Sequence, residues 1–286
     1  MKINKITPQG YCNGVKNAYN IVLSIIDNQN IKRPITLLGN LIHNEFVMNE
    51  LRQKGVAIKN DNNKTRLEML DDINEGTVVF SAHGVSKKVY SKAKEKGLEI
   101  VDTTCPYVSI IHNKIDEYID KGYEIIYIGT RNHPECEGIL ENNSKINLVT
   151  NTAEANDLSL NSSLIYVTNQ TTLSIFDLKE IYYVIQSKYP NAIIDNKVCN
   201  ATTLRQEAVL KQEPVDLCIV VGDKNSSNTN KLAYSSSKAG INTILIESVE
   251  EIKSYNFNDI KSVSVTSGAS VPSYLVDEVI EFLEKK

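Results

Sequence analysis

The sequence predicts an α/β protein built from three similar units of about 90 residues, related by pseudo-threefold symmetry. Three observations predict this fold: cysteines recur at a nearly constant interval, each precedes an expected helix, and strand-like segments recur at similar distances after it. Cys12 and Cys105 are 93 residues apart, and Cys105 and Cys199 are 94 residues apart. Strands separated by helical stretches are typical of parallel α/β units. We expect the units to span residues 1–103, 104–197 and 198–286.

Each of these three cysteines lies between a short expected strand and an expected helix. The strands are predicted at residues 2–6, 98–101 and 192–194. After Cys12 and Cys105, apolar residues begin three positions after the cysteine and recur at the same increments, which is the pattern of one helix face. The third helix, expected at residues 202–212, is shorter and shares this pattern less well.

Two further strands follow each of these helices. The first ends in glycine and is predicted at residues 34–39, 123–129 and 215–222. The second is predicted at residues 77–81, 163–168 and 262–266. In open parallel sheets, ligands bind beyond the carboxyl ends of the strands. The loops after these strands are therefore the first place to look for a functional site.

These loops are unusually polar. They hold three of the four histidines and a set of neutral hydrogen-bonding residues: His43, Asn44, His83, His133, Glu135, residues 169–172, residues 225–228 and residues 267–270. The fourth histidine, His112, falls inside the second helix, where we expect a surface or partly packed residue. Neutral donors and histidines without an apolar slot suit an oxyanion such as phosphate or diphosphate. The polar run 225–228 has a simpler interpretation as well, because such residues often cap a helix.

Composition excludes several functional classes. The chain has 31 basic and 35 acidic residues, a net charge of −4 and no basic block, which disfavours a dedicated nucleic-acid binder. Its longest apolar runs, at 125–128 and 217–221, are far shorter than the ~18 residues of a membrane helix. The N-terminus lacks the apolar core of a signal peptide. We expect a cytoplasmic globular protein without a P-loop or a Rossmann phosphate loop.

The five cysteines form neither a disulfide framework nor a C-x-x-C pair. Cys218 lies in an apolar strand and is expected in the core, whereas Cys136, in the loop beside Glu135, has no counterpart in the other units. Cys12, Cys105 and Cys199 lie at helix N-termini, which favour thiolates, and a threefold axis would bring them together. Three thiolates can hold a [4Fe–4S] cluster with one open iron. Zinc with three thiolates and a histidine is the competing chemistry.

Ordered motifs across nearly the whole chain carry a family resemblance. They lie at residues 10–15, 42–44, 80–85, 102–106, 133–138, 169–174, 199–206, 225–228 and 266–270. In these motifs the sequence resembles the LytB/IspH family of 4-hydroxy-3-methylbut-2-enyl diphosphate reductases. Tyr11, Asn200 and Cys136 stand where the family commonly has Phe, Tyr and Val. None of these departures removes a ligand.

The resemblance implies a trefoil of three α/β domains around a central [4Fe–4S] cluster that has one iron without a protein ligand. Cys12, Cys105 and Cys199 match the cluster ligands. The residues that match the diphosphate site are His43, His83, His133, Ser226, Ser227, Asn228 and Ser270. Glu135 matches the proton source, and Thr171, with Thr172 beside it, is expected near the substrate hydroxyl.

The implied reaction is a two-electron reductive dehydroxylation that gives isopentenyl and dimethylallyl diphosphates, the last step of the methylerythritol phosphate pathway. The partners would be the small diphosphate substrate and an external electron donor such as ferredoxin or flavodoxin, with no nucleic acid and no membrane. Two alternatives stay open. A non-catalytic iron–sulfur sensor would need the cluster ligands without a polar cage, and a zinc-dependent phosphate-ester hydrolase would need zinc at the cysteines.

Overall fold

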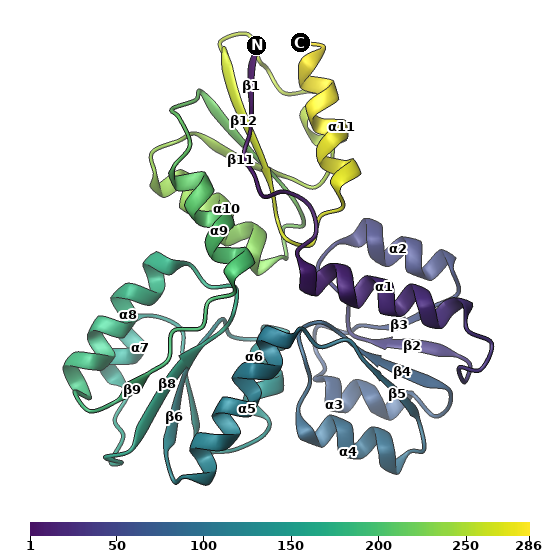
Figure 1. Ribbon diagram of the computed structural model, residues 1–286, viewed down its shortest axis with the longest axis vertical. Helices are drawn as coiled ribbons and strands as arrows, with labels where there is room; N and C mark the ends of the chain where they lie inside the picture. The colour runs from purple at the N-terminus through teal and green to yellow at the C-terminus, as the bar shows by residue number, and fades with distance from the viewer.

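The computed structural model describes residues 1–286, apart from the side chain of Ile175. The chain forms three lobes that meet at a common centre (Figure 1). Within the described residues, each lobe contains one four-stranded parallel sheet with helices on both faces. The predicted fold, three similar α/β units in a trefoil, is confirmed.

The first lobe begins immediately after Cys12. Its strands are β2 (Ile35–Leu38), β3 (Ala57–Lys59), β4 (Thr77–Phe80) and β5 (Glu99–Asp102), in the sheet order β3-β2-β4-β5. Its helices are α1 (Asn13–Asp27), α2 (Glu45–Gln53), α3 (Arg66–Met69), the 3₁₀ turn η1 (Leu70–Asp72) and α4 (Lys87–Glu95). Buried side chains of α1 and α2 pack on one face of the sheet, and those of α3, η1 and α4 pack on the other.

The second lobe repeats this arrangement. Its strands are β6 (Glu124–Ile128), β7 (Ile146–Val149), β8 (Ile165–Asn169) and β9 (Ile193–Ile194), in the order β7-β6-β8-β9. Its helices are α5 (Pro106–Asp120), α6 (Pro134–Leu140), α7 (Thr152–Asp157) and α8 (Ile175–Lys188). The central strands of both lobes are rich in buried Val, Ile and Leu, as expected for parallel strands covered on both faces.

The third lobe is built from both ends of the chain. Its strands are β1 (Lys2–Lys5), β10 (Leu217–Val221), β11 (Thr243–Ile246) and β12 (Ser262–Ser267), in the order β1-β12-β10-β11. Its helices are α9 (Asn200–Leu210), α10 (Ser227–Lys238), the 3₁₀ turn η2 (Val249–Ile252) and α11 (Ser273–Glu284). The two chain ends lie close together at the tip of this lobe (Figure 1).

The position of β1 corrects the predicted unit boundaries. Residues 1–103 were expected to form the first unit, but β1 pairs in parallel with β12, with Ile3 opposite Val263, and so belongs to the third sheet. The same edge position is held by β5 in the first sheet and by β9 in the second. In every lobe, the strand before a cysteine therefore closes one sheet, and the helix after that cysteine opens the next lobe. This connection brings each cysteine to the centre of the trefoil.

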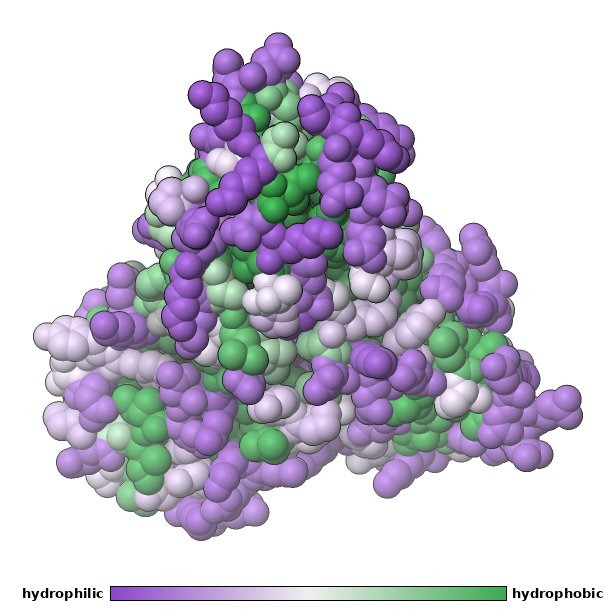
Figure 2. Space-filling view, turned by 45° about the horizontal axis from the view of Figure 1, so that its top comes forward, coloured by the Kyte–Doolittle hydropathy of each residue, from purple (hydrophilic) through white to green (hydrophobic). Residues whose placement is uncertain are grey.

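On the face drawn in Figure 2, hydrophilic residues cover most of the surface, and apolar residues are exposed in separate small groups. No helix in the described part of the chain is both long enough and apolar enough to span a bilayer.

Candidate functional site

A cavity at the centre of the trefoil brings together residues from all three lobes. Every site residue selected from the sequence lines it: Cys12, His43, His83, Cys105, His133, Glu135, Thr171, Thr172, Cys199, Ser226, Ser227, Asn228 and Ser270. Its empty volume, including its open mouth, is about 730 Å³. Residues scattered over the whole sequence thus share one site, although their individual roles stay predictions.

Three thiols converge in this cavity from equivalent positions. Cys12, Cys105 and Cys199 are the N-cap residues of α1, α5 and α9. The Sγ of Cys12 accepts a hydrogen bond from the N–H of Val15 at 3.4 Å. A Cβ added to Gly14 would lie 2.6 Å from the Sγ of Cys105 and 3.9 Å from that of Cys12. The absence of a side chain at Gly14 therefore leaves the space that sulfur ligands need.

The electrostatics of the thiols favour a shared cationic centre. Burial raises the pKa of Cys105 and of Cys199, and the charge of the neighbouring thiols raises each further. The first-turn N–H groups of α5 and α9 oppose this shift. Three thiolates held so close repel one another unless a metal centre lies between them. This donor set, three thiols that line one cavity, fits an iron–sulfur cluster held by three cysteines.

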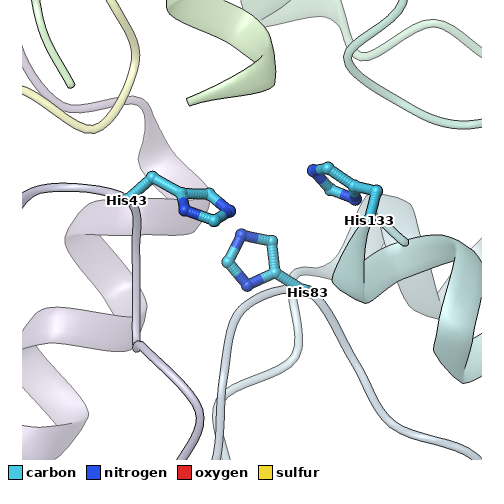
Figure 3. Close-up of side chains that lie close together, drawn as sticks. All are labelled: His43, His83 and His133. Atoms are coloured by element: carbon cyan, nitrogen blue, oxygen red, sulfur yellow. The ribbon is translucent and has the colours of Figure 1, made fainter. Parts of the chain in front are cut away.

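Three histidines from two lobes form a second group in the same cavity (Figure 3). His43 precedes α2, His83 follows β4, and His133 is the N-cap of α6. Their ring centroids are 4.9 to 5.9 Å apart, and one nitrogen of each ring lies within 4.8 Å of the others. Such a group can bind a divalent cation through its ring nitrogens or an oxyanion through its N–H groups.

The protonation of the rings favours the oxyanion. Burial lowers the pKa of His43 and of His83, and it lowers the pKa of His133 to about 3. The rings are therefore neutral near pH 7, and each has one N–H to donate. In His133, Nδ1 accepts from the N–H of Glu135 at 3.1 Å, which leaves Nε2 as the donor. The Nε2 of His43 is buried and has no hydrogen-bond partner among the described residues.

The third lobe adds neutral donors at the start of α10. Ser226 caps this helix by accepting from the N–H of Thr229 at 3.3 Å, so the capping interpretation of residues 225–228 is correct for Ser226. Thr202 donates its hydroxyl to the Oδ1 of Asn228 at 3.2 Å. The Nδ2 of Asn228 is buried without a partner in the described structure, although this side chain lines the cavity. The amide nitrogen of Asn228 and the Nε2 of His43 are thus two buried polar atoms without a partner among the described residues, and a bound ligand could supply one.

Glu135 lies on a helix, which corrects the sequence prediction of a loop. Pro134 begins α6, because proline suits the first helical position, and His133 caps it. Glu135 is 1% exposed. Its Oε1 accepts from the N–H of Thr171 at 2.9 Å, and its Oε2 accepts from the Thr171 hydroxyl at 2.9 Å. The Tyr127 hydroxyl lies 3.3 Å from Oε1. Burial outweighs these hydrogen bonds and raises the pKa of Glu135 to about 7.

An ion pair between lobes fixes α6 against the first lobe. Arg66 donates its N–H and Nη1 to the carboxylate of Glu137 at 2.7 and 3.2 Å. A Cβ on Gly138 would lie 3.3 Å from the backbone of Val85, so α6 packs directly on the segment that follows His83. This contact could not be predicted from the sequence, since a charged residue such as Arg66 is usually exposed.

The remaining candidates have packing roles or lie outside the cavity. Cys136 is 1% exposed, belongs to the core of the second lobe, and lies 3.4 Å from the Oε1 of Gln170. Cys218 is fully buried in β10, as expected. His112 is partly exposed on α5 and lies outside the residues that line the central cavity.

Comparisons with known proteins agree with this arrangement. The family model described as LytB protein matches residues 3–284. A 4-hydroxy-3-methylbut-2-enyl diphosphate reductase from Geobacillus sp. (strain WCH70) is 43% identical, covering 100% of this chain and 91% of the relative. The structure resembles the E-1-hydroxy-2-methyl-but-2-enyl-4-diphosphate reductase from Plasmodium falciparum, with a TM-score of 0.91, 30% identity and coverage of 99% and 87%. It also resembles (E)-4-hydroxy-3-methyl-but-2-enyl diphosphate reductase, described as the terminal enzyme of the non-mevalonate pathway, with a TM-score of 0.69, 30% identity and full coverage of both chains.

The matched segment spans nearly the whole chain, and a relative aligned over its full length is 43% identical. The chain therefore belongs to the LytB protein family.

Proposed function

We propose that this protein is a 4-hydroxy-3-methylbut-2-enyl diphosphate reductase, which converts its substrate to isopentenyl and dimethylallyl diphosphates. The observation that carries this proposal is one cavity that combines three converging thiols, a cage of neutral donors and a buried carboxyl group. The names of full-length relatives support the same reaction. The balanced reaction consumes two electrons and two protons and releases one water.

Cys12, Cys105 and Cys199 would hold a [4Fe–4S] cluster and leave one iron without a protein ligand. When bound, the cluster would supply electrons to the substrate and a Lewis-acidic iron for its hydroxyl group. The convergence of the thiols and the space at Gly14 support this assignment. An external donor such as ferredoxin or flavodoxin would deliver the electrons one at a time.

The diphosphate would bind to the neutral donors, which are His43, His83, His133, Ser226, Ser227, Asn228 and Ser270. The buried donors of His43 and Asn228 would gain the acceptor that they lack. Ser270 donates to the carbonyl oxygen of His43 at 2.9 Å and so joins the third lobe to the first at this point. Because the diphosphate is remote from the reacting carbon, its binding energy would serve to orient the carbon chain.

Glu135 would supply the proton that lets the hydroxyl group leave as water. Its raised pKa, about 7, keeps much of it protonated near neutral pH. The Thr171 hydroxyl, 2.9 Å from the Oε2 of Glu135, is placed to accept that proton and pass its own to the substrate oxygen. The remaining allylic fragment, which carries the two electrons, is then protonated at either end, and this gives the two products.

The second candidate is the zinc-dependent phosphate-ester hydrolase, with zinc at the cysteines. Three histidine ring nitrogens within 4.8 Å of one another lie in the same cavity and could also bind zinc. Anaerobic purification separates the two functions. The reductase predicts brown protein with about four iron atoms per chain, and conversion of the diphosphate substrate when a reduced dye supplies electrons. Colourless protein loaded with zinc would contradict it. An iron-loaded protein that never turns over would support the sensor alternative.

Loss of a cage donor should weaken substrate binding without affecting the cluster. His43→Ala and Asn228→Ala each remove a hydrogen bond to a charged group, worth ~1.5–3 kcal/mol, or roughly ten- to over a hundredfold in affinity. Anaerobic calorimetry measures the Kd, and the visible spectrum reports the cluster. His112→Ala, outside the cavity, is the matched control. Loss of iron in His43→Ala would mean that His43 is a metal ligand, and the proposed open iron would be wrong.

A further inference from the structure

A buried cation lies close to two of the three thiols, those of Cys12 and Cys199, and has no role in the chemistry described above. Arg205, on α9, is 3% exposed. Its Nη1 donates to the carbonyl oxygen of Ala201 at 3.0 Å, and its Nη2 donates to that of Gly10 at 2.7 Å. Ala201 is two residues after Cys199, and Gly10 is two residues before Cys12. One guanidinium therefore ties together the segments that carry two of the three thiols.

The charge of Arg205 has no carboxylate partner in the described part of the chain. The ion pairs found there do not include it, whereas the other deeply buried arginine, Arg66, is paired with Glu137. The Nε of Arg205 is also buried without a hydrogen-bond partner among the described residues. Burial lowers the pKa of this guanidinium, and the nearby thiols of Cys12 and Cys199 act in the opposite direction. A buried cation without a counter-charge is costly, so these thiols are its natural anionic partners.

We propose that Arg205 is the counter-cation of the iron–sulfur cluster and makes the cluster easier to reduce. This inference rests on the proposed function, because it requires the cluster at Cys12, Cys105 and Cys199. A cluster held by three thiolates becomes more negative by one charge when it accepts an electron. A fixed positive charge at short range in a poorly solvated site stabilises the reduced form more than the oxidised form. Arg205 is not among the residues that line the cavity, so it would act on the cluster through its charge and not by contact with the substrate.

The test compares variants that separate charge from hydrogen bonding. Arg205→Gln keeps amide donors but loses the charge, Arg205→Lys keeps the charge but loses the two-pronged donor, and Arg52→Gln is the control. Arg52 is a well-exposed arginine at the end of α2, where it pairs with Glu45. The reduction potential of each reconstituted protein, without substrate, is measured by redox titration followed by electron paramagnetic resonance. Thermal melting reports the structural effect of each change.

We expect Arg205→Gln to lower the equilibrium constant for one-electron reduction by about tenfold or more, a shift of about 59 mV or more toward negative potential. Arg205→Lys should recover most of this shift, and Arg52→Gln should leave the potential unchanged. A loaded Arg205→Gln protein with the wild-type potential would overturn the proposal and leave Arg205 as a structural tie. Equal shifts in Arg205→Gln and Arg205→Lys would also overturn it, because hydrogen bonding rather than charge would then be responsible.

If Arg205→Gln fails to fold or to hold iron, Arg205→Lys decides the question alone. If the equilibrium constant for one-electron reduction of Arg205→Lys stays within a few-fold of the wild-type value, the result supports a role for the charge. A tenfold fall in this constant contradicts it. A wild-type protein that binds no iron would instead overturn the proposed function. The two failures are therefore distinguishable by the iron content of the wild type.

Discussion

Cys105→Ser is expected to lose the cluster and all measurable turnover. The three lobes supply one thiol each, from the N-cap positions of α1, α5 and α9, and no spare thiol lines the cavity. A serine hydroxyl is a poor ligand for iron in a cluster, because it is far less acidic than a thiol. Cys12→Ser and Cys199→Ser should behave in the same way. Iron and sulfide analysis after anaerobic reconstitution measures the loss, and turnover with a reduced dye measures its consequence.

Two cysteines of the same chain are matched controls for this series. Cys218 is fully buried in β10, and Cys136 is 1% exposed in the core of the second lobe. Both thiols lie outside the converging group, so Cys218→Ala and Cys136→Ala should keep iron content near that of the wild type. A Cys105→Ser protein that retained its iron and activity would defeat the argument from threefold symmetry.

The repeat in the sequence predicted most of the fold because it shows both where single helices lie and how the three lobes are related. The helices after Cys12 and Cys105 have an apolar face that is visible in the sequence, and the interval between the cysteines relates the lobes. The sheet that contains β1 could not be predicted in this way, because Lys2–Lys5 pairs with a strand about 260 residues away. An edge strand of four residues has no side-chain pattern that specifies its neighbour. Helix α6 was missed because seven residues are too few to show periodicity, although Pro134 marks its start.

The candidate site was predictable as a set of residues but not as a geometry. The rule that ligands bind at the carboxyl ends of parallel strands selected the polar loops, and the repeat selected the cysteines. The supporting residues were not selected. Tyr127, which contacts Glu135, is part of an apolar strand and looks like a core residue. Arg66 and Arg205 are buried cations, and a sequence does not show which of its charged residues are buried.

Glu135→Gln is expected to separate substrate binding from chemistry. Glutamine keeps the size and hydrogen-bonding capacity of glutamate, so the contacts with Thr171 can be kept. It cannot donate an acidic proton, so turnover should fall by ~10²-fold or more, the usual contribution of a positioned acid. Cluster content and substrate affinity should stay near wild type, and Glu95→Gln, on an exposed position of α4, is the control.

The pH dependence gives this prediction a second, independent measurement. Burial raises the pKa of Glu135 to about 7, and only the protonated form is an acid, so wild-type turnover should fall as the pH rises through about 7. The folded chain then holds this proton more tightly than the unfolded chain, where the carboxyl has its ordinary pKa of 4.5. Folding stability should therefore decrease as the pH rises from about 4.5 to about 7.

Glu135→Gln should remove both pH effects: the decline of turnover with rising pH and the decline of folding stability with rising pH. Turnover profiles and thermal melting across this pH range measure the two separately. A variant that lost the pH dependence of stability but kept near-normal turnover would show that the buried carboxyl is not the proton source. His133 would then be the next group to test, although burial lowers its pKa to about 3 and leaves it a poor proton donor at neutral pH.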